Sequence, residues 1–371
     1  MGKNLLICGT GQNVDNILHR LSPECKVIGY TDCNSIFKGY SIFDGYYYKP
    51  LKEYNINDID FVIISYSNQD NIEVALNEFE ILKDKCIVYE WFKEATIVNP
   101  LIKYKDSPID YEQLIFGMSH SQVDILTQLL NKKTYKFSLP SMDLFCQLQL
   151  LKNILKDGEC KANRIKNIIL ELPYYIFNYD LSKSVRSVKK RLYYFKLFDD
   201  YHNYGLNEKE QYVIKQFENF LITFQYGNPE IIRNNMDEPN DKKGLKQFAY
   251  SLIDQKNVMR ENNNVWAKKR PNTISDNIKI FNEFIKLLKD TYPNANITAI
   301  VCPFNPIFRL KNKRSIHRMK KMYYEEMEKK DISIIDNFEL YHNPFLFNDH
   351  CHLKLEAAYA YTKYIKEQHK W

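Results

Sequence analysis

The chain of 371 residues has no cysteine pair in the C-x-x-C spacing that is typical of zinc sites and redox centres. Its eight cysteines are scattered, several of them in apolar runs, so we expect buried, reduced thiols and no metal site. The chain also lacks an apolar run of about 18 residues and an N-terminal apolar segment with a cleavage site. These absences predict a cytoplasmic protein without a transmembrane segment.

Charge of one sign is not in large excess either. The 52 basic and 46 acidic residues give a formal net charge of +6, spread along the chain. We therefore predict no nucleic-acid partner. The densest basic stretch, residues 183–191, has two interpretations: a solvated helix face, or a patch for an anionic polymer or membrane surface.

What is present is an ordinary globular composition, with 44% hydrophobic and 26% charged residues, over about twice the usual domain length. Strand and helix patterns alternate, which predicts an α/β fold with parallel sheets. We place a Rossmann-like domain at 1–95 and a flavodoxin-like α/β/α domain at 108–371. The strand pattern disappears at about 181–292, which predicts a helical insertion or lid.

Apolar runs give the expected strands of both domains. In the first domain they are 4–8, 26–30, 60–65 and 86–89, and in the second they are 113–116, 135–139, 165–172, 297–302 and 332–335.

The first domain carries a weak nucleotide-binding pattern. Gly9 and Gly11 lie between a strand and a helix, where a phosphate could approach the backbone, and Asp32 ends the second strand, where it could meet a ribose hydroxyl. The third glycine of the dinucleotide motif is missing, so packing of a Rossmann-like fold explains the glycines equally well.

The second domain carries residues for nucleophilic catalysis at its two ends. Ser119 lies in a Gly-Met-Ser-His-Ser turn between an apolar strand and a helix. Asp349 and His352 follow the last strand, three positions apart, so one turn can carry both. A serine hydroxyl becomes a useful nucleophile when an imidazole takes its proton and a carboxylate orients that imidazole. We predict that these three side chains meet.

Each of these residues also has a structural interpretation. Ser119 could cap the following helix, and Asp349 could be an N-cap with His352 as a first-turn surface residue. His120 and His350 flank the set and are alternative bases.

The pairing of Gly-x-Ser near the start of the domain with Asp-x-x-His-Leu near its end resembles the SGNH (GDSL-type) hydrolase superfamily, over about residues 113–367. The resemblance implies Ser119 as nucleophile, His352 as general base and Asp349 as its orienting partner. The superfamily includes esterases and carbohydrate O-acetyl transferases, and the resemblance implies ester chemistry that requires no cofactor.

In that family the oxyanion hole also uses a glycine after the second strand and an asparagine after the third. This chain departs from both, and Ser141 and Asn178 are the candidates at those places. The departures resemble a divergent branch associated with acylation of surface polysaccharides.

The N-terminal domain is similar to the nucleotide-sugar-binding domain of bacterial sugar O-acyltransferases, over about 90 residues. Together the resemblances imply a bacterial serine esterase or O-acyltransferase of polysaccharide biosynthesis. Its substrate would be a sugar or glycan carrying O-acyl, specifically O-acetyl, groups, and the N-terminal domain would hold a nucleotide sugar. The alternative is a noncatalytic nucleotide-sugar-binding or scaffolding protein.

Overall fold

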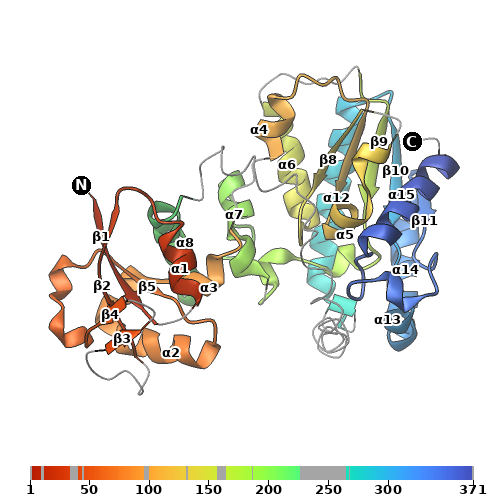
Figure 1. Cartoon of the computed structure of the whole chain (residues 1–371). Coiled ribbons are helices and arrows are strands. Elements are labelled where there is room, and N and C mark those ends of the chain that lie inside the picture. The colour runs from red at the N-terminus through yellow and green to blue at the C-terminus, as the bar shows by residue number, and fades with distance from the viewer. Residues whose placement is uncertain are drawn as a thin grey trace. The chain divides into compact units, whose positions relative to one another are not determined.

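The computed structural model describes residues 2–9, 12–33, 41–43, 46–95, 100–130, 133–156, 164–185, 187–225, 265–266 and 268–369. Within these ranges the chain forms two compact units (Figure 1). One holds the residues up to 95 together with 182–225, and the other holds 100–181 and the residues from 265 onward. Both are α/β, which confirms the predicted fold class.

The first unit contains a six-stranded sheet in the order β3-β4-β2-β1-β5-β6, parallel except for the β3–β4 pair. Its elements are β1 (Lys3–Cys8), α1 (Gln12–Leu18), β2 (Cys25–Thr31), β3 (Ser41–Phe43), β4 (Tyr46–Tyr48), β5 (Phe61–Ile64), α2 (Gln69–Glu78), β6 (Cys86–Val88) and α3 (Tyr89–Phe92). The four predicted strands are confirmed. The sequence analysis missed β3 and β4, since three residues are too few for an alternating pattern.

Two further helices, α7 (Val188–Phe198) and α8 (Glu208–Thr223), also belong to this unit. Aromatic residues of α8 pack on α3: the Phe92 ring lies 5.5 Å from that of Phe217 and 5.4 Å from that of Phe220. The prediction of one insertion or lid on the second domain at 181–292 is therefore wrong for these helices. The aromatic side chains of α8 pack on the core of the first unit.

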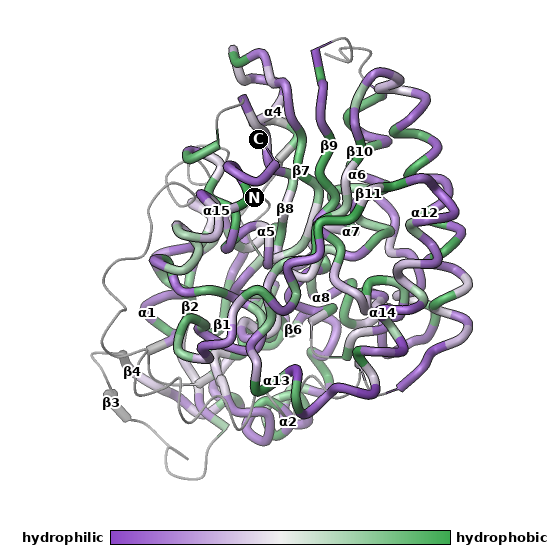
Figure 2. The backbone as a smooth tube through the Cα atoms, turned by 90° about the vertical axis from the view of Figure 1, so that its right-hand side faces the viewer, coloured by the Kyte–Doolittle hydropathy of each residue, from purple (hydrophilic) through white to green (hydrophobic). Residues whose placement is uncertain are grey.

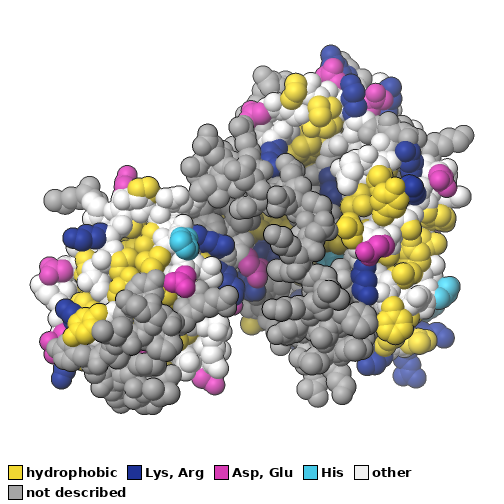
Figure 3. Space-filling model, viewed as in Figure 1, with side chains coloured by type: hydrophobic (Ala, Val, Ile, Leu, Met, Phe, Trp, Pro, Cys, Tyr) yellow, Lys and Arg dark blue, Asp and Glu magenta, His cyan; other side chains and the backbone are white. Residues whose placement is uncertain are grey.

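The basic stretch lies at the start of α7. Lys190 and Arg191 both pair with Glu94, at 2.7 and 3.4 Å, and the Lys189 ammonium lies 3.2 Å from the centre of the Trp91 ring. Figure 3 shows basic side chains interspersed with acidic ones on the visible face. These contacts favour the structural interpretation of the basic stretch over an anion-binding patch.

The second unit contains a five-stranded parallel sheet in the order β11-β10-β9-β7-β8. Numbered within the unit, this is the doubly wound order 2-1-3-4-5 of flavodoxin-like folds. Its strands are β7 (Gln113–Gly117), β8 (Thr134–Ser138), β9 (Asn167–Glu171), β10 (Asn296–Val301) and β11 (Ser333–Asp336), close to the predicted positions. Its α-helices are α4 (Pro100–Lys105), α5 (Ser119–Asp124), α6 (Leu144–Lys156), α12 (Pro271–Thr291), α13 (Pro306–Lys311), α14 (Lys313–Glu328) and α15 (Leu355–His369).

Helices cover both faces of this sheet, because neighbouring residues of a strand point to opposite sides. Ile115 of β7 belongs to a core cluster with Tyr361 of α15, whereas the next residue, Phe116, meets Phe284 of α12 at 5.6 Å between ring centres. The central strands are coloured hydrophobic in Figure 2. Among the described helices, none is long and apolar enough to cross a bilayer.

Candidate active site

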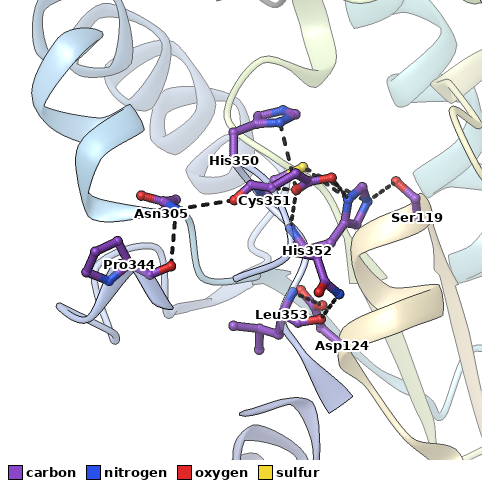
Figure 4. Close-up of polar contacts among 10 residues, drawn as sticks. Ser119, Asp124, Asn305, Pro344, His350, Cys351, His352 and Leu353 are labelled. Atoms are coloured by element: carbon purple, nitrogen blue, oxygen red, sulfur yellow. Dashed lines mark hydrogen bonds and ion pairs between the residues drawn. The ribbon is translucent and has the colours of Figure 1, made fainter. Parts of the chain in front are cut away.

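The nucleophile candidate, Ser119, is the first residue of α5, directly beyond the carboxyl end of β7. The preceding turn is tight: a Cβ on Gly117 would collide with the Ser121 hydroxyl and lie 2.7 Å from the Glu171 Cβ, so only glycine fits. The Ser119 hydroxyl lies 2.8 Å from Nε2 of His352 (Figure 4). The end of β7 and the start of α5 thus place the Ser119 hydroxyl at the edge of the sheet where parallel α/β proteins bind ligands.

The base candidate is held in a short loop before α15. Asp349 Oδ1 accepts hydrogen bonds from the backbone N–H groups of Cys351 and His352, both at 2.8 Å. Its other oxygen, Oδ2, lies 2.6 Å from Nδ1 of His352. One carboxylate oxygen therefore shapes the loop, and the other orients the imidazole with Nδ1 as the donor and Nε2 as the acceptor for Ser119.

The charged forms of His352 and Asp349 stabilise one another. Burial by itself would lower the pKa of His352, but the carboxyl groups of Asp349, Asp124 and Glu171 together raise the pKa above the usual 6.5, with Asp349 contributing the most to this rise. Burial opposes ionisation of Asp349, yet the neighbouring imidazole holds the pKa of this carboxyl well below its usual range. The arrangement favours an imidazole of raised basicity beside an ionised carboxylate.

No protein-family profile matches this chain, and no curated protein matches it. The solved structures that are similar to this chain include the following two. One is a protein provisionally assigned as a platelet activating factor from Streptococcus pneumonia, with a TM-score of 0.41 and 12% identity, covering 80% of this chain and 98% of that one. The other is the acetyl xylan esterase Est2A from the rumen bacterium Butyrivibrio proteoclasticus, with a TM-score of 0.31 and 13% identity, covering 71% and 66%. At these TM-scores neither decides the activity of this chain.

The two histidines that sequence analysis gave as alternative bases are placed differently. Burial lowers the pKa of His350 to about 4, so this imidazole is neutral at pH 7, and its Nδ1 lies 3.9 Å from Asp349. His120 is buried and its Nδ1 lies 3.0 Å from Glu171. Ser119 is instead hydrogen-bonded to His352, whose Nε2 accepts from its hydroxyl.

The two oxyanion candidates differ. Ser141 follows β8 with a φ of 61°, the left-handed conformation that favours glycine, and it stays a candidate. Asn178 is not available: its amide nitrogen donates to the carbonyls of Val265 and Lys268, at 2.6 and 2.8 Å. Its predicted role is wrong, because both amide hydrogens anchor the segment that precedes α12.

Sequence analysis missed Glu171, the last residue of β9. This fully buried carboxylate accepts hydrogen bonds from the Met118 N–H at 2.8 Å and the Ser121 hydroxyl at 3.3 Å, in addition to the His120 contact. It therefore fixes the backbone on both sides of Ser119. An acidic residue inside an apolar strand pattern was the available signal, since buried charges are costly without partners.

A second missed residue, Asp124, ends α5 in the core. Its Oδ1 accepts from the N–H of Leu353 at 2.9 Å, and its backbone carbonyl accepts from the Thr362 hydroxyl at 3.2 Å. Burial raises the pKa of Asp124 well above its ordinary value. Asp124 thus joins the helix that begins with Ser119 to the loop that carries the His352 imidazole.

The nucleotide-binding candidates of the first unit lie at the carboxyl ends of β1 and β2. Gly9 has a φ of 108° and donates its N–H to the Thr31 carbonyl at 2.9 Å. Asp32 accepts a hydrogen bond from the Tyr66 hydroxyl at 2.9 Å. Gly11 lies outside the described residues. Because β1 and β2 are adjacent and parallel, Gly9 and Asp32 lie at the same edge of the sheet.

Proposed function

We propose that this chain is a serine esterase or O-acyltransferase in which Ser119, His352 and Asp349 form the catalytic triad. The observation that carries the proposal is the continuous hydrogen-bonded chain from hydroxyl to imidazole to carboxylate, at 2.8 and 2.6 Å. Burial and pKa shifts favour the same assignment of roles. An N-cap serine and a surface histidine do not need such a chain.

The geometry supports a two-step acyl transfer. The Ser119 oxygen attacks the carbonyl carbon of an ester while Nε2 of His352 takes the hydroxyl proton. The backbone N–H groups of Ser119 and Ser141 are the candidate donors to the resulting oxyanion. As the C–O bond breaks, His352 returns the proton to the departing alcohol. Water or a sugar hydroxyl then attacks the acyl-enzyme by the same route.

The substrate class rests on the resemblances described above. We infer an O-acyl group, specifically O-acetyl, on a sugar or on a precursor of a surface polysaccharide. The proposed ester chemistry uses only residues of the second unit and requires no cofactor.

Turnover of p-nitrophenyl acetate tests the triad. Ser119→Ala should abolish turnover above background, whereas Ser333→Ala, an exposed serine of β11, should leave it unchanged. A fluorophosphonate probe should label the wild type at Ser119, as peptide mass mapping can verify. Equal turnover by wild type and Ser119→Ala would refute the triad and favour the noncatalytic alternative.

For the first unit we propose a nucleotide-sugar site at the edge formed by Gly9 and Asp32. A carboxylate at the end of β2 can accept hydrogen bonds from ribose hydroxyls, and Asp32 lies there, next to the end of β1 that carries the buried Gly9. Thermal shifts with UDP-sugars and with NAD would compare the ligands. Asp32→Asn should reduce the shift, and the absence of a shift with either ligand would refute the site.

A further inference from the structure

The triad leaves two buried groups beside its imidazole without a role: the ring of His120 and the thiol of Cys351. One ring nitrogen from each of His120 and His352 and the Cys351 sulfur lie within 4.8 Å of one another. The sulfur lies 3.7 Å from Nδ1 and 4.0 Å from Nε2 of His352. His120 is 1% exposed and Cys351 is 2% exposed, so two of the three groups are enclosed by the fold.

Both imidazoles are backed by a carboxylate. Asp349 contacts Nδ1 of His352 at 2.6 Å, and Glu171 contacts Nδ1 of His120 at 3.0 Å. This leaves Nε2 as the ligand atom that each ring can offer. Histidines that bind metals usually donate their other N–H to a carboxylate or carbonyl, which fixes the ring and increases its basicity. The cluster therefore has both the ligands of a metal site and the outer partners that orient them.

We propose that His120, Cys351 and His352 bind one thiophilic divalent cation, Zn²⁺, and that the bound ion reversibly inhibits the esterase. The inhibition rests on the proposed function, whereas the binding does not. Two imidazole nitrogens and one sulfur suit Zn²⁺ and not Mg²⁺ or Ca²⁺, which prefer oxygen. The ligand spacing could not be recognised in the sequence, because it joins residue 120 to residues 351 and 352.

The required rearrangement is small. Metal–ligand bonds of about 2.0–2.3 Å place the ligand atoms of a tetrahedral site roughly 3.3–3.8 Å apart, so the cluster must contract by about an ångström. Cys351 would release its thiol proton to solvent. Nε2 of His352 would give its lone pair to the metal in place of the Ser119 hydrogen bond. The base would then be unable to take the serine proton.

Cadmium is a suitable probe, because a Cd²⁺–thiolate bond absorbs in the ultraviolet by charge transfer. The sulfurs of Cys8 and Cys33 lie 3.3 Å apart in the first unit and form a competing thiol pair. The titrations should therefore use the full-length Cys33→Ser protein. Cys351→Ser is then added in one variant and, as a matched control, Cys25→Ser in another.

The expected result is one Cd²⁺ that binds with a charge-transfer band in the Cys33→Ser protein and in its Cys25→Ser derivative. Cys351→Ser should lose the band and bind at least tenfold more weakly, since even residues that only support metal ligands change affinity by about 10–100-fold. Circular dichroism should show that this variant is folded. His120→Gln should weaken binding but keep the band. An unchanged band and affinity in Cys351→Ser would overturn the proposal.

Two further measurements separate this inference from the proposed function. Ser119→Ala should bind Cd²⁺ at least as tightly as its parent, because no hydroxyl then competes for Nε2 of His352. Inhibition of p-nitrophenyl acetate turnover by Zn²⁺ should be reversed by EDTA and should require at least about tenfold more Zn²⁺ in Cys351→Ser.

If Cd²⁺ binds through Cys351 but no turnover occurs, the esterase proposal fails and the metal site stands. If turnover occurs without Cys351-dependent binding, the metal site fails alone.

Discussion

Replacement of Asp349 by asparagine removes the charge beside the His352 imidazole while it preserves the shape of the loop. The Oδ1 atom, which accepts the N–H groups of Cys351 and His352 at 2.8 Å, has an equivalent in asparagine, so the loop should keep its shape. The Oδ2 atom, 2.6 Å from the imidazole, becomes an amide N–H group. That group donates to Nδ1 and moves the ring proton to Nε2, where it faces Ser119.

In this tautomer the imidazole cannot accept the serine proton. The comparable change in a serine protease lowers kcat by about 10⁴-fold, and we expect a similar loss here. At about 1.36 kcal/mol for each tenfold change, this is roughly 5.5 kcal/mol of transition-state stabilisation. The pKa of His352, which the carboxylate raises, should also fall.

The assay is p-nitrophenyl acetate hydrolysis across pH, with thermal melting as a check of folding. Asp290→Asn, the same chemical change at an exposed position of α12, is the matched control and should behave as wild type. A loss of less than tenfold in kcat for Asp349→Asn, with an unchanged pH profile, would refute the proposed role of this carboxylate.

Three other predictions follow from the same contacts. Activity needs neutral His352, so kcat/KM should rise with pH and reach its midpoint above 6.5; a midpoint at or below 6.5 would contradict the raised pKa. Asp124→Ala should lower the free energy of unfolding by about 1–3 kcal/mol, because it leaves the buried Leu353 N–H without an acceptor. Asp124→Asn keeps an acceptor and should lose less stability. Equal losses in the two variants, measured by urea denaturation, would exclude this cause. Gly117→Ala forces a methyl group against the Ser121 hydroxyl and should cost about 1–3 kcal/mol, which a melting temperature equal to wild type would disprove.

Sequence patterns located most of the fold because its strands are buried on both faces and read as continuous apolar runs. The runs at 113–116 and 297–302 became β7 and β10 with shifts of one residue at their ends. Helices α7 and α8 were misplaced because an amphipathic pattern shows that a face is buried but not which sheet buries it.

Some residues of the candidate site could likewise be recognised from the sequence, and others could not. Motif spacing was enough to single out Ser119 and His352, which the structure brings to 2.8 Å. The roles of Glu171 and Asn178 depend on which backbone groups face them, and those partners come from segments distant in sequence. No local pattern encodes such contacts, so the sequence suggested Asn178 for the oxyanion, although its amide is already hydrogen-bonded, and overlooked Glu171 next to Ser119.

The hydroxyl and its imidazole partner lie 233 positions apart, and the imidazole loop leads directly into α15, the last described helix. During synthesis on the ribosome, Ser119 therefore emerges long before His352. Thr362 of α15 donates to the Asp124 carbonyl, so the loop is secured only when this helix docks. A nascent or truncated chain that lacks residues 349–352 would carry Ser119 without its imidazole and carboxylate partners, so the hydrogen-bonded chain forms only after this segment has been made.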